Sequence, residues 1–117
     1  MIDRKRFNES FQYFDNDVII EVIDVFLNEF EERLNKLHTA ITENDLPEII
    51  FQAHSFKGVF GTFCAAEPFE LSSKIEELAK NNISAGLPEL FTRLHTATFE
   101  LAKELREIKN EFPSLSS

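Results

Sequence analysis

Apolar side chains recur at every third or fourth position along almost the whole chain, which is the spacing of helices that each bury one face. Only three glycines and four prolines occur in the 117 residues, so few positions can end a helix. No segment competes as a β-strand. The pattern therefore predicts an all-α fold.

Breaks in this pattern divide the chain into five predicted helices. They cover residues 4–14, 18–42, 47–63, 68–81 and 87–108. Short connections between the four longer helices favour antiparallel neighbours. We therefore expect an antiparallel up-down four-helix bundle, with an additional short N-terminal helix packed on it as a lid. Residues 1–112 are predicted to form a single domain, and residues 113–117 a flexible C-terminal tail.

The bulk properties exclude several classes of function. The formal net charge is −9, so the phosphate backbone of a nucleic acid would be repelled. No apolar run reaches about 18 residues, and polar residues follow Met1 closely, so neither a membrane span nor a secretory signal is expected. A single cysteine, Cys64, fits a reducing cytoplasm. The start at Met1 and the polar end favour a free-standing protein, with a monomer as the expected state.

The helix predicted over residues 47–63 points one histidine away from its apolar face. At about 100° per residue, six apolar side chains fall between roughly 100° and 180° from His54. They are Ile49, Ala53, Phe56, Val59, Phe60 and Phe63. Because this arc is the predicted core face, we expect His54 to point into solvent.

Small and apolar residues surround His54 on the same predicted exposed stripe. Gly58 and Gly61 lie within about 40° of it, and each costs a helix interior about 1 kcal/mol relative to alanine. Stability alone does not explain this cost, so the two glycines indicate that another molecule approaches His54 closely. Ile50 and Phe51 are expected to be exposed apolar neighbours suited to docking a partner protein.

The segment from Ala53 to Phe63 reads Ala-His-Ser-Phe-Lys-Gly-Val-Phe-Gly-Thr-Phe, and Lys57 lies where its ammonium group can reach a phosphoryl group on the His54 imidazole. This segment resembles the His-x-x-Lys-Gly signature of histidine-containing phosphotransfer domains. It is also similar to the phosphorylated domain of chemotaxis kinases. Features similar to the family extend over about residues 14–80, including the Leu-x-x-x-Ile-Glu pattern of residues 71–76.

The resemblance implies roles for three residues. His54 would be the phosphoacceptor, Lys57 would be a charge partner of the phosphate, and Glu76 would bond the other ring nitrogen and so orient the imidazole. The chain departs from the family at two positions. Cys64 stands where many members have glycine, so the end of this helix is expected to differ in shape. Val59 replaces the small residue that is common after the Lys-Gly pair.

The implied function is that of a phosphocarrier in a two-component phosphorelay. Such a carrier accepts a phosphoryl group on His54 and exchanges it with an aspartate of a response-regulator receiver domain. A sensor or hybrid histidine kinase is the second expected partner. The chain has neither a Walker phosphate-binding loop nor a kinase glycine-rich loop, so it is not expected to be an enzyme with its own kinase activity. No cofactor is expected in this chain, and Mg²⁺ is expected on the partner.

Two functions of other classes compete with the carrier. A non-catalytic adaptor bundle would bind a receiver domain or kinase without carrying phosphate, and it would not need a histidine at position 54. A carboxylate-bridged metal bundle needs Glu-x-x-His pairs, and none occurs in the sequence, so no metal ligands are expected.

The other chemically versatile residues are given structural roles. His38 and His95 lack the neighbours of His54 and are expected to be structural or solvent-facing. Cys64 is expected to be a small buried hydrophobe. The 13 phenylalanines are expected in the core, except Phe51.

Overall fold

The computed structural model describes residues 2–112, and the predicted C-terminal tail at residues 113–117 lies outside this range. Within residues 2–112 the chain is all-α, as predicted, apart from one isolated β-bridge. The five helices are α1 (Arg4–Phe11), α2 (Asn16–Thr42), α3 (Leu46–Thr62), α4 (Ala66–Lys80) and α5 (Leu87–Glu111). None of these five helices combines the length and the apolar character needed to cross a lipid bilayer.

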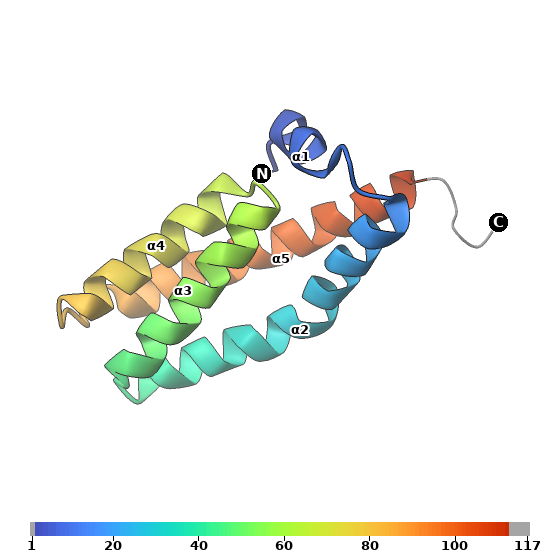
Figure 1. Cartoon of the computed structure of the whole chain (residues 1–117). Helices are drawn as coiled ribbons and strands as arrows, with labels where there is room; N and C mark the ends of the chain where they lie inside the picture. Colours follow the sequence, from blue (N-terminus) through green and yellow to red (C-terminus); the bar gives the residue numbers. More distant parts are fainter. Residues whose placement is uncertain (1, 113–117) are drawn as a thin grey trace.

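Helices α2 to α5 form the predicted antiparallel bundle (Figure 1). Helix α2 packs against α3 and α5, and α4 packs against the same two helices, so the four helices close a ring around one core. The short α1 lies at one end of the bundle, near the connection between α3 and α4. Helix α3 is thus flanked by α2 on one side and by α4 on the other.

Polar contacts fasten the N-terminal segment to the bundle. The backbone N–H of Asp3 donates to the carbonyl of Cys64 at 3.1 Å, which ties the start of α1 to the connection between α3 and α4. The guanidinium group of Arg4 donates to both carboxylate oxygens of Glu111 on α5, at 3.1 and 2.9 Å. The predicted lid is therefore held at two separate elements of the bundle.

Not all phenylalanines lie in the core, so this part of the prediction is wrong. Seven are buried: Phe7, Phe11, Phe26, Phe30, Phe56, Phe60 and Phe63. Four are exposed: Phe14, Phe51, Phe69 and Phe99. A helical repeat shows which residues share a face, but it does not show how much of that face a neighbouring helix covers. Helix α1 ends at Phe11, three residues earlier than predicted. Phe14 shares the apolar repeat of this segment, but it is half exposed and adds little to the buried face.

Helices α2, α3 and α4 each end just before a residue with a left-handed backbone. These residues are Asn44, Cys64 and Asn82, with φ values of 54°, 56° and 59°. At Cys64, two backbone hydrogen bonds of 3.1 and 3.0 Å close a Schellman motif. A side chain makes this conformation sterically costly, and glycine avoids the cost. Cys64 therefore adopts the conformation that glycine favours, and its side chain adds strain to the end of α3.

Helix α4 begins at Ala66, two residues before the predicted start at Pro68. Backbone N–H groups in the first turn of a helix have no acceptor within the helix, so a proline fits there without loss of a hydrogen bond. The predicted start of the last helix at residue 87 is confirmed. The residue before it, Gly86, has a left-handed φ of 87°.

Candidate functional site

His54 lies near the middle of α3, and its side chain is 68% exposed, as the helical projection predicted. Its Nδ1 atom is 2.9 Å from Oε2 of Glu76 on α4. Glu76 is itself buried, with 4% of the residue exposed. Helix α4 thus supplies a carboxylate beneath an exposed imidazole ring, in the pairing that the resemblance implied.

The Glu76 carboxylate accepts from three groups at once. Besides the His54 ring, Oε1 accepts from Nζ of Lys57 at 2.9 Å, and Oε2 accepts from Nζ of Lys80 at 3.1 Å. Burial alone would raise the pKa of the Glu76 carboxyl group. Hydrogen bonds from Lys57, Lys80 and His54 outweigh burial and lower this pKa from 4.5 to about 2. Glu76 is therefore an ionised carboxylate at neutral pH.

The ionised carboxylate fixes which ring nitrogen of His54 carries the hydrogen. A carboxylate has no hydrogen to donate, so Nδ1 must be the donor in the 2.9 Å contact with Glu76. In a neutral imidazole the second nitrogen, Nε2, then has a free lone pair. Because the ring is exposed, this lone pair is open to attack an electrophile brought by another molecule.

Gly58 and Gly61 both lie on the exposed surface of α3, as predicted. A Cβ atom added to Gly58 would meet no heavy atom within 4 Å, and one added to Gly61 would make only ordinary contact with the Phe69 ring at 3.6 Å. Packing within the described chain therefore requires neither glycine. Their cost of about 1 kcal/mol each therefore has no explanation in the packing of residues 2–112.

The two apolar neighbours of His54 differ in exposure. Phe51 is 65% exposed, as predicted. Ile50 is only partly exposed and packs against the core, so the expectation of an exposed Ile50 is wrong. On the helix, Ile50 lies on the same side of His54 as Lys57, which faces α4, whereas Phe51 lies on the side that faces α2. Phe51 is therefore the better candidate for contact with a partner.

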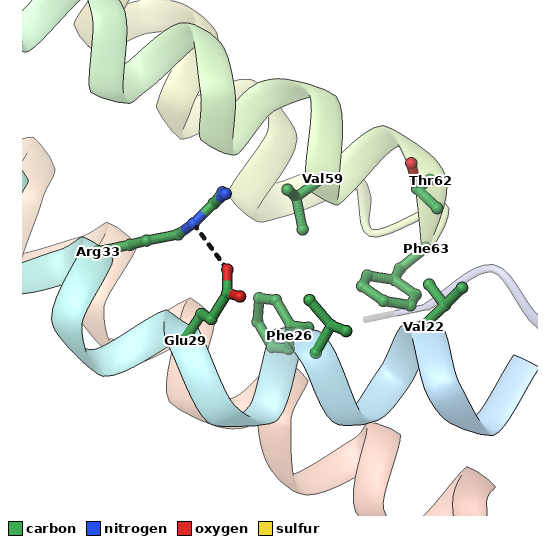
Figure 2. A pocket seen from close by; sticks show the side chains of 8 residues that line it. Val22, Phe26, Glu29, Arg33, Val59, Thr62 and Phe63 are labelled. Atoms are coloured by element: carbon green, nitrogen blue, oxygen red, sulfur yellow. Dashed lines mark ion pairs between the residues drawn. The ribbon is translucent and has the colours of Figure 1, made fainter.

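An apolar groove runs between α2 and α3 on the side of Phe51. Its volume is about 240 Å³, and its lining residues are Val22, Val25, Phe26, Glu29, Arg33, Val59, Thr62 and Phe63. Figure 2 shows Val22 and Phe26 of α2 facing Val59 of α3 and Phe63, the residue after α3, with the Arg33–Glu29 ion pair (3.7 Å) at one end. Arg33 also donates to Oγ of Ser55 at 3.2 Å, and Ser55 is the residue next to His54. The groove therefore begins beside the site.

The remaining histidines and the cysteine lie outside the site. His38 and His95 are both exposed, in agreement with the prediction, and both lie against Phe91 with their rings tilted, with ring centroids 5.1 and 6.1 Å away. Cys64 is partly exposed rather than buried, so its expected burial is wrong. No cluster of metal-ligating side chains occurs within residues 2–112.

Comparison with known proteins places the chain in a family. A family model described as "Hpt domain" matches residues 21–111, which include His54, Lys57, Glu76 and Lys80. The chain belongs to the Hpt domain family. No curated protein matches the chain. Among solved structures, the Hpt domain is similar to histidine-containing phosphotransfer protein B (HptB) from Pseudomonas aeruginosa PAO1, with a TM-score of 0.87 and 24% sequence identity over 96% of each chain. At this identity the likeness establishes the shared helical fold.

Two parts of this Hpt domain site were missed from the sequence. Lys80 follows Glu76 by four residues, a helical spacing that brings opposite charges together, and this signal could have found it. No pattern in the sequence indicates the groove between α2 and α3, because residues far apart in the sequence line it. The groove is seen only when the packing of the two helices is known.

Proposed function

We propose that this Hpt domain is a phosphocarrier that holds a phosphoryl group on Nε2 of His54. One observation carries the proposal: the ring of His54 is exposed, while its Nδ1–H is held by a buried, ionised carboxylate. An adaptor that only binds its partners would need neither the free lone pair nor the buried charge beneath it. Burying a carboxylate is costly unless several donors satisfy it, and here the donors converge beside one histidine.

The exchange partner in this proposal is an aspartyl phosphate of a response-regulator receiver domain. The Nε2 lone pair attacks phosphorus, the N–P bond forms, and the P–O bond to the aspartate breaks so that the aspartate leaves as a carboxylate. The ring then has hydrogen on Nδ1 and phosphorus on Nε2, and it carries a positive charge. Glu76 stabilises this cation at 2.9 Å, as the carboxylate of a serine-protease triad stabilises imidazolium. The reverse transfer needs no proton to leave the site.

The surface on the α2 side of His54 is where we propose that the receiver domain docks. Phe51 is exposed there, Gly58 leaves the helix surface bare, and the apolar groove opens between α2 and α3. Buried apolar and aromatic contacts dominate the energetics of such interfaces. Because Arg33 connects the groove to Ser55, a partner seated in the groove is held next to the nucleophile.

The partner supplies the parts of the reaction that the carrier lacks. Phosphoryl transfer requires in-line positioning and neutralisation of charge by metal ions or cations. We assign Mg²⁺ to the receiver domain and ATP to a sensor or hybrid histidine kinase, so the carrier would have no kinase activity of its own. We further propose that it acts in the cytoplasm as a monomer.

The test is incubation with a phosphorylated receiver domain, or with a histidine kinase, ATP and Mg²⁺. The wild-type protein should acquire an acid-labile, alkali-stable phosphoryl label. The label should be lost in His54→Gln and retained in His38→Gln and His95→Gln, which remove exposed histidines elsewhere. A label that survives in His54→Gln, or its absence in the wild-type protein with every partner, would overturn the proposal.

A further inference from the structure

The two oxygens of Glu76 are not equally supplied with donors. Oε2 accepts from both Nδ1 of His54, at 2.9 Å, and Nζ of Lys80, at 3.1 Å. Oε1 accepts from Nζ of Lys57 at 2.9 Å, and no second donor contacts it within residues 2–112. If Lys57 left, a buried carboxylate oxygen would lose its partner, which is costly. If Lys80 left, Oε2 would keep the hydrogen bond from the imidazole.

Lys80 is also the more exposed of the two lysines. It is the last residue of α4, and its side chain is 59% exposed, against 29% for Lys57. Exposed ion pairs four residues apart on a helix stabilise a protein only weakly. The Lys80 ammonium group is nevertheless close to the ring: its Nζ atom is at most 6.0 Å from Nδ1 of His54, because 3.1 and 2.9 Å separate the two atoms from the oxygen they share.

Phosphorylation of His54 would change the balance of positive and negative charge around the Glu76 carboxylate. A phosphoryl group brings nearly two negative charges and three strong acceptor oxygens. The unphosphorylated cluster holds two ammonium groups against one carboxylate, so it has one cation in excess. The four-carbon side chain of a lysine can change rotamer to follow the new charge without movement of the backbone.

We propose that Lys80 is the phosphate-binding residue of the phosphorylated state: its ammonium group leaves Oε2 of Glu76 and binds the phosphoryl group on Nε2 of His54, while Lys57 stays on Oε1. This inference rests on the proposed phosphocarrier function. It reassigns the phosphate contact that the family resemblance gave to Lys57. Lys57 then becomes the residue that keeps the buried Glu76 paired while the phosphoryl group is present.

The experiment uses potassium phosphoramidate as a phosphoryl donor, so that no partner protein is needed. Nε2 of His54 attacks phosphorus, the N–P bond of the donor breaks, and ammonia leaves with the electron pair. The phosphorylated protein is then titrated by ³¹P NMR to find the midpoint at which the phosphoryl dianion gains a proton and becomes the monoanion. A bound ammonium group favours the dianion and lowers this midpoint. The variants are Lys80→Gln, Lys80→Arg and Lys57→Gln, with Lys74→Gln as the control for an exposed lysine on the same helix.

Lys80→Gln should raise the titration midpoint by about half a pH unit, a modest shift because the contact is exposed to solvent. Lys80→Arg should restore the low midpoint, and Lys74→Gln should match the wild-type protein. A midpoint unchanged in Lys80→Gln, or raised at least as much in Lys57→Gln, would overturn the role of Lys80 while leaving the phosphocarrier function intact. If phosphoramidate does not phosphorylate His54 in the wild-type protein, the proposed function fails, and this inference fails with it.

Discussion

Replacing Glu76 by glutamine should remove a pH-dependent contribution to stability whose size follows from the site. The carboxyl group has a pKa of about 2 in the folded protein against 4.5 as its ordinary value. A lowered folded pKa stabilises the protein at pH above the unfolded value, and this stabilisation is lost as pH falls from 4.5 toward 2. The difference of about 2.5 pH units corresponds to about 3 kcal/mol as an upper bound, since Lys80 is exposed to solvent.

Urea denaturation at two pH values measures this contribution. The free energy of unfolding of Glu76→Gln should lie below that of the wild-type protein by up to about 3 kcal/mol at pH 5.5, and by up to about 2 kcal/mol at pH 3.5. Glu77→Gln, which removes the exposed neighbouring acid, should differ little from the wild-type protein at either pH. A difference for Glu76→Gln that does not shrink with falling pH would refute this account of the charge cluster.

Three further substitutions test other parts of the structure. Gly58→Ala should raise the free energy of unfolding in urea by about 1 kcal/mol. Gly58→Leu should slow transfer from a receiver domain by obstructing its approach, and a transfer rate equal to that of the wild-type protein would contradict the close-contact argument. Cys64→Gly should stabilise the protein by about 0.5 kcal/mol by relieving the left-handed φ, and Cys64→Ala should not. Val25→Asp, in the groove, should reduce the rate of transfer from the receiver at least about tenfold, while Val18→Asp, at a similarly exposed valine outside the groove, should not. Equal reductions in the two variants would argue against docking in the groove.

The position of His54 could be predicted because it depends on one helix alone. The repeat along α3 fixes the core face, and a residue opposite that face points outward whatever the neighbouring helices do. The same projection placed Ile50 and Phe51 at similar angles from His54, yet only Phe51 is exposed, whereas Ile50 is partly buried. Their difference arises from α4, which approaches α3 on the side of Ile50. A single helix contains no information about that approach.

The charge cluster was only partly predictable. The contact of Glu76 with His54 joins residues 22 positions apart on two helices, and a resemblance to a family, rather than physics, suggested it. The strained end of α3 at Cys64 was likewise suspected from the family pattern, and the φ of 56° explains why glycine would suit this position. The convergence of Lys57 and Lys80 on one buried carboxylate depends on how α3 and α4 pack together.

The most direct test of the central claim is to find which atom carries the phosphoryl group. The protein is labelled with ¹⁵N-histidine, phosphorylated, and studied at neutral to alkaline pH by ¹H–¹⁵N and ³¹P NMR. Since Glu76 holds Nδ1–H, phosphorus should be bonded to Nε2 of His54, and the Nδ1 resonance should move when Glu76→Gln is introduced. Phosphorus on Nδ1, or on any residue other than His54, would contradict the account.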